Sequence, residues 1–361
     1  MSGINLLDSP KYQSTLTAGY DDQATLGFSQ RTCHLKAATY TRYGPPEVVT
    51  ISEIQKPSPK PNEILIRIRA TTLNSGDARM RRSDFGSPLF TILGRLMLGI
   101  RKPRKQILGT TLAGEVESLG DIVTGFNVAD KVFASAGMTF GAHAQYITIP
   151  QDSTVLEMPE NLSFEQAASI PFGGFTALHF LRKLTTIKPN QRILINGAAG
   201  GVGSSAVQLA KHDGAHVTAV CSASHAEFVK SIGADETIDY NAEDFRQRSD
   251  TYDIIFDTVG KLSFSKCKRS LNKNGRFLAA DMNGPIILQM LWTKMMSNKK
   301  LISGVALDKP EHLKTLKDLV ESGAIKPTID RTYPFDEIQQ AHKFVDTGHK
   351  SGSIVITMYD I

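Results

Sequence analysis

The stretch INGAAGGVGSSAVQLAK, residues 195–211, decides the fold of this chain. An apolar run leads into a turn of small residues, and a helix-forming run follows directly. The turn fits the pattern G-x-G-x-x-G with alanine in the first place. In such a turn the second glycine lets the backbone approach a pyrophosphate, and the N–H groups of the first helical turn attract the anion. We predict a dinucleotide site with phosphate contacts from Ala198, Gly200, Gly201, Val202 and Gly203; the alternative is a glycine turn that serves packing alone.

The segments around this turn alternate between strand-like and helix-like runs. The strand-like runs are RILING, HVTAVC, ETIDY, YDIIFDTV and GRFLAA, and KKLISGVAL (299–307) resembles a last strand at the edge of the sheet. Strands separated by helices of this length predict a doubly wound parallel sheet. We place this dinucleotide-binding domain at residues 163–307, and we expect its first helical segment to be broken by Pro171 and the Gly173–Gly174 pair.

The rest of the chain has a different pattern of apolar and turn-forming residues. Residues 36–162 consist of short β-like runs bounded by Gly, Pro, Asn and Asp, which predicts a compact β domain. Residues 308–361 end in β-like runs that we expect to rejoin this domain. Residues 1–35 are polar and aperiodic, and we interpret them as an N-terminal arm.

The second strand of the parallel sheet indicates which dinucleotide binds. An NAD site usually has Asp or Glu at the end of this strand, where it binds the ribose 2′-hydroxyl. Here the strand HVTAVC ends without a carboxylate, and Ser222 and Ser224 follow it. Their hydroxyls, with Tyr240 after the next strand, suit a 2′-phosphate, so we predict NADPH. Alternatively, the two serines only cap the next helix.

Composition narrows the class of protein. The 361 residues are 41 % hydrophobic and 21 % charged with a net charge of +5, which is ordinary for a globular protein and too weakly basic to indicate nucleic acid. The three cysteines match no metal spacing, and no apolar run reaches the about 20 residues of a membrane span. We therefore expect a cytoplasmic protein without an integral membrane segment.

The whole pattern resembles the medium-chain dehydrogenase/reductase superfamily, in particular its zinc-free quinone oxidoreductase (zeta-crystallin-like) branch. The resemblance runs from Lys36 to Met358 and rests on YGPPEVV, TTLNSGD, GTTLAGEVESLG, DKVF, GAHAQY, AASIPFGGFTAL, GAAGGVG, IGADETIDY, YDIIFDTVG and GSIVI. It implies an α/β fold with a GroES-like β domain, an inserted Rossmann domain and an active site between them. It also implies a homodimer that pairs through the edge strand of the parallel sheet.

The resemblance has one informative departure. The three positions that hold the catalytic zinc in related alcohol dehydrogenases are Asn74, Thr110 and Phe172 here, so no thiolate or imidazole remains. Alcohol oxidation loses its Lewis acid, whereas a quinone or an alkene conjugated to a carbonyl accepts hydride directly. We predict an NADPH-dependent reductase of quinones or α,β-unsaturated carbonyls. The alternatives are a non-catalytic NADPH-binding structural or redox-sensing protein and, less in keeping with these residues, a zinc-type alcohol dehydrogenase.

The resemblance also suggests site residues. Asn74 matches an asparagine beside the nicotinamide that donates to substrate oxygen, or it caps the following helix. Asp77 matches an aspartate that more readily caps or orients than transfers protons. Arg79 departs from the family, in which similar quinone reductases often carry tyrosine; it favours anionic or more polar acceptors, or it points to solvent. Thr176 contacts the nicotinamide, or it bonds to its own helix carbonyls. Lys350 reaches the cofactor phosphates or is a solvated lysine.

One segment resembles an insertion. FTILGRLMLGIRKPRKQ, residues 90–106, is apolar first and then strongly basic. Three interpretations stay open: a flap over the substrate, a contact with an acidic lipid surface, and a half-buried loop with solvated charges.

Overall fold

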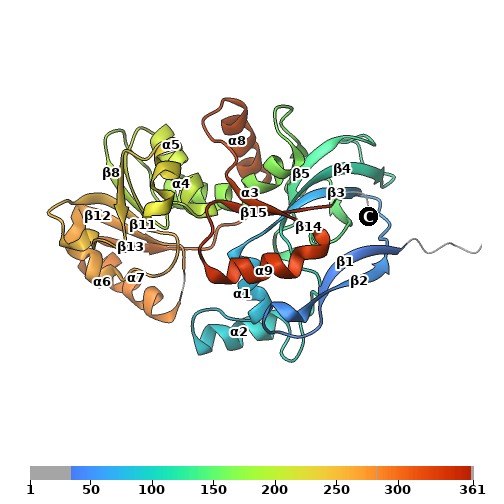
Figure 1. Ribbon diagram of the computed structural model, residues 1–361, viewed down its shortest axis with the longest axis horizontal. Coiled ribbons are helices and arrows are strands. Elements are labelled where there is room, and N and C mark those ends of the chain that lie inside the picture. Colours follow the sequence, from blue (N-terminus) through green and yellow to red (C-terminus); the bar gives the residue numbers. More distant parts are fainter. Residues whose placement is uncertain (1–33, 282, 359–361) are drawn as a thin grey trace, which may run out of the picture. The chain divides into compact units, whose positions relative to one another are not determined.

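The computed structural model describes residues 34–281 and 283–358 (Figure 1). The predicted N-terminal arm lies outside these residues except for its last two, which open strand β1 (His34–Tyr40). β1 pairs along its whole length with the antiparallel strand β2 (Val49–Gln55) in a small sheet of its own. Strand β1 thus includes the last two residues of the predicted arm, and both of them pair with β2.

A six-stranded parallel sheet carries the glycine turn. Its strand order is β10-β9-β8-β11-β12-β13, so the chain starts in the middle, runs to one edge and returns to complete the other half. This is the predicted doubly wound topology, and the order reverses between β8 and β11. The strands are β8 (Arg192–Asn196), β9 (His216–Cys221), β10 (Glu236–Asp239), β11 (Tyr252–Asp257), β12 (Leu271–Ala279) and β13 (Lys300–Ser303).

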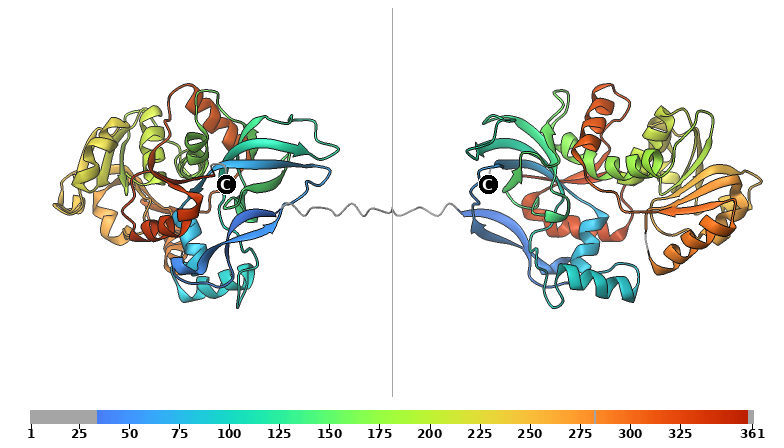
Figure 2. Two further views of the ribbon diagram at one scale, coloured as in Figure 1. Left: turned by 45° about the vertical axis from the view of Figure 1, so that its right-hand side comes forward. Right: turned by 180° about the vertical axis from the view of Figure 1, so that it is seen from behind.

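Helices cover both faces of this sheet, which explains why its strands are apolar on both sides. Ile193 and Ile195 of β8 belong to the hydrophobic cluster that includes residues of α4 and α5, whereas Leu194 belongs to the cluster around α6 and α7. The two pairs of helices lie on opposite sides of the strands in Figures 1 and 2. Their bounds are α4 (Gly201–His212), α5 (Ala226–Ser231), α6 (Phe264–Cys267) and α7 (Gly284–Met296).

The second large sheet is mixed and seven-stranded. Its order is β14-β15-β3-β4-β5-β7, and β6 also pairs with β3. β15 lies antiparallel to β3, so the C-terminal segment joins the sheet that the N-terminal half begins. The strands are β3 (Glu63–Leu73), β4 (Thr111–Leu119), β5 (Lys131–Ser135), β6 (Tyr146–Pro150), β7 (Val155–Glu157), β14 (Ile329–Pro334) and β15 (Ser353–Thr357). The exact domain boundaries at 162/163 and 307/308 stay a prediction.

Helix α3 (Phe164–Leu178) connects the two sheets and does not break where we expected. It runs through Pro171 and continues as a π-helical turn, His179–Lys183. A proline inside a helix removes one backbone hydrogen bond, but most of α3 is buried, and this packing keeps the helix continuous.

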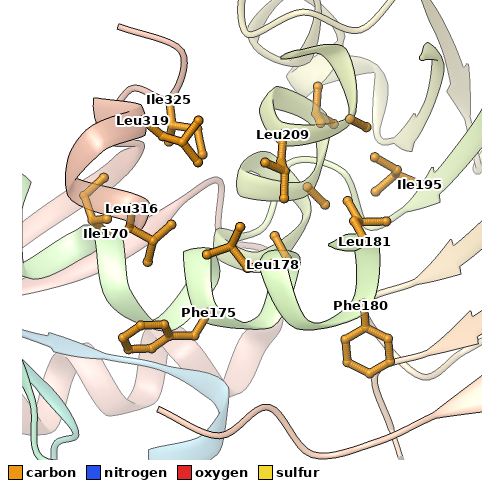
Figure 3. Packing of buried hydrophobic residues seen from close by; sticks show 14 of the residues in the cluster. Ile170, Phe175, Leu178, Phe180, Leu181, Ile195, Leu209, Leu316, Leu319 and Ile325 are labelled. Atoms are coloured by element: carbon orange, nitrogen blue, oxygen red, sulfur yellow. The ribbon is translucent and has the colours of Figure 1, made fainter. Parts of the chain in front are cut away.

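The two glycines of α3 serve close packing instead of a break. A Cβ at Gly173 would collide with the carbonyl oxygen of Gly201 in α4, and one at Gly174 would lie 2.6 Å from Leu316 Cδ2. Leu316 belongs to helix α8 (Pro310–Glu321), so α3 lies between α4 and α8 in the largest hydrophobic cluster (Figure 3). This packing fixes α3 against the glycine turn.

Helices α2 (Pro88–Leu98) and α9 (Ile338–Thr347) were not predicted, whereas α1 (Ser75–Arg82) is the helix that one interpretation of Asn74 expected after it. The predicted loop 90–106 is therefore partly wrong, because its first half is helical. α2 begins where Ser87 Oγ accepts a hydrogen bond from Phe90 N at 3.3 Å, and it ends at Gly99, whose φ of +124° favours glycine. The predicted strand 299–307 is also shorter, since β13 ends at Ser303.

Candidate active site

The N-terminus of α1 is closed by a reciprocal pair of side chains. Asn74 Oδ1 accepts a hydrogen bond from Asp77 N at 3.1 Å, and Asp77 Oδ2 accepts one from Asn74 N at 2.9 Å. This capping box uses the carbonyl half of the Asn74 amide and leaves its Nδ2 as a donor. Both predicted interpretations of Asn74 are thus compatible with the geometry: the residue caps the helix and still has N–H groups to offer.

Asp77 is a buried positioning residue. Its second oxygen, Oδ1, accepts a hydrogen bond from Gly109 N at 3.1 Å, which ties α1 to the segment before β4. Burial raises the pKa of its carboxyl, and the neighbouring His143 and the backbone donors act in the opposite direction. Asp77 is therefore closed off from solvent and accepts from two backbone N–H groups, which is compatible with the predicted capping or orienting role; that role stays a prediction.

The three residues at the positions that hold zinc in related alcohol dehydrogenases lie close together. Asn74 Nδ2 lies 3.4 Å from Thr110 Oγ1. The ring of Phe172 lies beside the same turn, since its Cε2 is 3.8 Å from the position of a Cβ on Gly76. An amide, a hydroxyl and a phenyl ring do not form a zinc site. Within residues 34–281 and 283–358, no group of three His, Cys, Asp or Glu side chains is placed to hold a metal.

The glycine turn has the geometry that phosphate binding requires. Gly197 has φ +76°, and a Cβ on Gly203 would collide with the Gly197 carbonyl oxygen and lie 2.8 Å from Ala198 Cα. Gly203 is therefore needed for packing. A Cβ on Gly200 would meet only the Gly197 oxygen at 3.5 Å, so the space beside Gly200 is open to a ligand. No side chain caps α4 here, so the N–H groups of its first turn remain as donors for an anion.

The segment before β15 crosses this turn and brings Lys350 to it. Gly352 N donates to Ala199 O at 2.7 Å, and Gly352 pairs with Gly200 as an isolated parallel bridge. Lys350 is half-buried, and burial lowers the pKa of its ammonium to about 8, while the charges of Asp77 and Asp330 act in the opposite direction. The ammonium is thus within electrostatic range of Asp77, which links the glycine turn to the N-terminus of α1.

The serines after β9 form a hydroxyl cluster. Ser222 Oγ lies 2.9 Å from Ser224 Oγ and 3.0 Å from His225 Nδ1, and it makes no capping bond to the short helix that follows. Tyr240 is exposed just after β10. The nearest carboxylate on this edge, Asp239, accepts hydrogen bonds from Asn241 in its own turn. The cluster therefore presents hydroxyl groups where an NAD site presents a carboxylate.

Thr176 and Arg79 have partners that limit their roles. Thr176 Oγ1 donates to Phe172 O at 3.0 Å within α3, which is the structural interpretation of this threonine. The Arg79 guanidinium forms an ion pair with Asp281, which follows β12 in the parallel sheet. Neither predicted role of Arg79, a contact with anionic acceptors or a free solvated charge, describes this pair. The partner is far away in the sequence, so no local pattern indicates it.

The sequence also gave no indication of Asp308 and Ser135. Ser135 Oγ, at the end of β5, donates to the carboxyl of Asp308, in the loop between β13 and α8, and lies 3.2 Å from Thr110 O. Burial raises the pKa of Asp308. Three contacts connect Asp308 to Asn74, by way of Ser135 and Thr110. Only the folded chain brings these segments together.

Two family models match parts of the chain. Residues 60–160 match the family described as alcohol dehydrogenase GroES-like domain, and residues 232–356 match the family described as zinc-binding dehydrogenase. The second match contains none of the three positions at issue for zinc, and the side chains present there do not fit that metal.

Several relatives with known names align with most of the chain. A chloroplast envelope quinone oxidoreductase homolog from Arabidopsis thaliana is 32 % identical over 84 % of this chain and 92 % of its own. An NADPH-dependent alkenal/one oxidoreductase from the same organism is 30 % identical over 89 % of this chain and 79 % of its own. The solved quinone oxidoreductase of Coxiella burnetii superposes with a TM-score of 0.80 at 29 % identity, covering 90 % of this chain and all of that one. The chain belongs to the quinone oxidoreductase branch of the medium-chain dehydrogenase/reductase superfamily.

Proposed function

We propose that the protein is an NADPH-dependent reductase of quinones and α,β-unsaturated carbonyls that works without zinc. The single observation that carries the proposal is the side-chain set at the N-terminus of α1, where Asn74, Thr110 and Phe172 meet. This set offers hydrogen-bond donors and no metal ligands, which suits an acceptor reactive enough to take hydride directly. Relatives named as quinone and alkenal/one oxidoreductases support the same substrate class.

The residues around the glycine turn would hold the cofactor. The open space beside Gly200 and the uncapped N-terminus of α4 suit the pyrophosphate, and the cationic Lys350 adds a charge from the other side. The hydroxyls of Ser222 and Ser224 suit the 2′-phosphate. Bound NADPH supplies hydride from its nicotinamide ring. Thr176 on α3 and the remaining contacts stay predictions.

Asn74 has the central role toward the acceptor. The capping bond to Asp77 N holds Asn74 Oδ1, so the direction of Nδ2 is fixed before any substrate binds. A preorganised N–H donor stabilises negative charge that develops on the acceptor oxygen without any cost of reorientation. Asp77 acts through Asn74, because its own oxygens accept from backbone N–H groups. Asp308 and its Ser135 contact are the nearest carboxyl–hydroxyl pair that could return a proton.

The decisive test is turnover with and without metal. Purified protein should oxidise NADPH in the presence of a quinone or an enone, and a chelator should leave the rate unchanged. The same preparation should contain no stoichiometric zinc by elemental analysis. NADPH binding without turnover across a broad panel of quinones and enones would instead support a non-catalytic NADPH-binding protein. A rate that is lost on chelation and restored by zinc would contradict the proposal.

We further propose a homodimer that forms through the edge of the parallel sheet. β13 is the last strand of that sheet and has a neighbour on one side only, within the described residues. Helix α7 packs beside β13 and exposes a group of large apolar side chains: Leu288, Leu291, Trp292, Met295 and Met296. An unpaired edge beside an apolar helix suits a second copy of the chain. Sedimentation at micromolar concentration should give the mass of a dimer, and a monomer would contradict this.

The place of the protein in the cell stays a prediction. Over the described residues, no helix combines the length and the apolar character needed to cross a bilayer. The expected cytoplasmic location therefore has to be tested by fractionating cells that express the full chain.

A further inference from the structure

Helix α2 exposes its apolar side chains to solvent. No residue of α2 is buried, and the large side chains of its outer face, with Ile100 just after it, are each 46–71 % exposed. They recur at helical spacing and form one stripe: Leu89, Ile92, Leu93, Leu96, Met97 and Ile100. α2 lies at the lower edge of the molecule in all three views of Figures 1 and 2. We call these six residues the outer stripe.

The opposite side of α2 is held to the protein, so the outer stripe does not result from a loose helix. A Cβ on Gly94 would lie 2.5 Å from Cε2 of the Phe85 ring, which shows how closely the helix approaches that ring. Arg95 Nε donates to Ser83 Oγ at 3.2 Å, and the Tyr43 hydroxyl donates to Gly99 O at 2.8 Å. These contacts fix the rotation of α2 and leave its most apolar side outward.

A cluster of cations follows the outer stripe directly. Arg101, Lys102, Arg104 and Lys105 are all exposed, and none of them forms an ion pair with a described residue. No acidic residue occurs between Asp84 and Glu115. Together with Arg95, these four residues carry five positive charges, which equals the net charge of +5 of the whole chain. We call the four residues after the helix the basic loop.

We propose that the outer stripe and the basic loop dock on the surface of an anionic lipid bilayer. The stripe consists of aliphatic side chains and methionine without hydrogen-bonding groups, which suits the boundary between headgroups and acyl chains. Each cation near a negatively charged leaflet is attracted to the anionic headgroups and strengthens the binding. A second copy of the chain fits less well, because a two-fold axis through this surface would place one basic loop against the other.

Docking at this surface would bring the bilayer close to the acceptor side of the site. Only residues 83–87 separate α2 from α1, and Asn74 caps the far end of α1, which is about 12 Å long at 1.5 Å per residue. This consequence rests on the proposed function: a lipophilic quinone dissolved in the bilayer would reach the site without crossing water. The docking itself depends only on the stripe and the loop.

The test is binding to vesicles, measured without NADPH or acceptor. The full chain should float with vesicles of phosphatidylcholine and phosphatidylserine, and not with vesicles of phosphatidylcholine alone. The variant R101Q/K102Q/K105Q should bind the anionic vesicles at least about tenfold more weakly. The matched control K188Q/K266Q/K273Q removes the same charge from exposed lysines elsewhere and should bind like the wild type. Equal binding of the two triple variants would overturn the proposal.

The apolar half of the surface needs its own variant. I92Q/L96Q replaces two residues of the outer stripe without changing charge, and it should also bind anionic vesicles about tenfold more weakly. Turnover with a water-soluble quinone should be the same as that of the wild type in both variants, which shows that they fold. If the wild type forms an oligomer that I92Q/L96Q abolishes, and both bind vesicles equally, the stripe is a protein interface and the proposal is wrong. Absence of turnover with intact vesicle binding would contradict only the proposed function.

Discussion

The candidate site has a cofactor half and an acceptor half, and the two differ in the kind of chemical group that forms them. The part of the cofactor half that suits the pyrophosphate is mostly backbone: a glycine turn, the first turn of α4 and a crossing segment that bonds to Ala199 O. The acceptor half is made of side chains from distant segments, with Asn74, Thr110 and Phe172 at its centre and the Ser135–Asp308 pair at its edge. Backbone N–H groups bind a phosphate whatever the side chains are, whereas side chains define which acceptor is bound. The cofactor half can therefore be retained while substitutions in the acceptor half change which substrate is bound.

The largest expected effect comes from the acceptor half. Asn74→Asp keeps an N-cap residue, so the fold is retained, but it replaces the Nδ2 donor with a negative charge. Loss of one preorganised donor lowers kcat by about 10²–10³-fold. Stopped-flow or steady-state oxidation of NADPH with a quinone would measure this. The NADPH affinity should not change, and an Asn74→Asp enzyme with normal kcat would show that the residue only caps α1.

The second-largest effect is expected from a substitution in the cofactor half. In Gly203→Ala the new Cβ collides with the Gly197 carbonyl oxygen, and the turn has to open. Overpacking of this kind costs about 1–3 kcal/mol, so we expect NADPH affinity to fall by about 10- to 100-fold and the melting temperature to drop. Fluorescence titration with NADPH measures the first, and thermal unfolding the second.

Gly200→Ala is the matched control for this variant. Its Cβ meets only one protein atom, at 3.5 Å, so stability should be retained while the methyl group occupies space meant for the ligand. Weaker NADPH binding at an unchanged melting temperature is the expected result. Equal loss of stability in the two variants would mean that Gly200 also serves packing alone.

Lys350 joins the two halves, and its titration gives a smaller, pH-dependent effect. Its pKa of about 8 means that the ammonium is charged below pH 8 and neutral above it. Only the charged form attracts the cofactor phosphates, so NADPH affinity should fall as the pH rises through 8. Lys350→Gln should bind NADPH about tenfold more weakly at pH 7 and show no such fall. A wild-type affinity that stays flat from pH 7 to 9 would place Lys350 outside the phosphate site.

The smallest effect concerns the link between the domains. Arg79 and Asp281 form a partly exposed ion pair, and such pairs contribute about 0.2–1 kcal/mol. A double-mutant cycle with Arg79→Gln and Asp281→Asn should give a coupling energy in this range from urea unfolding. If Arg79 binds acceptors, its variant alone should raise KM for anionic quinones, and Asp281→Asn should not.

The sequence predicted the strand, turn and helix of the cofactor half because these elements are local. The turn, the helix after it and the missing carboxylate after β9 all lie within about thirty residues, as the dinucleotide pattern requires. The alternation of strands and helices also predicted the parallel sheet, since each strand is a short apolar run between polar turns.

The acceptor half was less predictable because its side chains come from segments that are far apart in the sequence. Whether Pro171 breaks a helix depends on how deeply α3 is buried, and that depends on Leu316 far along the chain. The partners Asp281 and Asp308 come from loops that have no pattern of their own. The apolar residues of α2 recur at helical spacing in the sequence and could have predicted the helix, but our interpretation of 90–106 as a single loop overlooked that spacing.

The return of β15 to β3 has a consequence for how the protein is made. Every strand of the parallel sheet lies between residues 192 and 303, so this sheet can be completed while the end of the chain is still inside the ribosome. Strand β3 is synthesised early, yet residues 70–73 along one of its edges wait for residues 354–357. This edge of β3 therefore stays unpaired in the nascent polypeptide until residues 354–357 have been synthesised, and we expect chaperones to bind it during that interval.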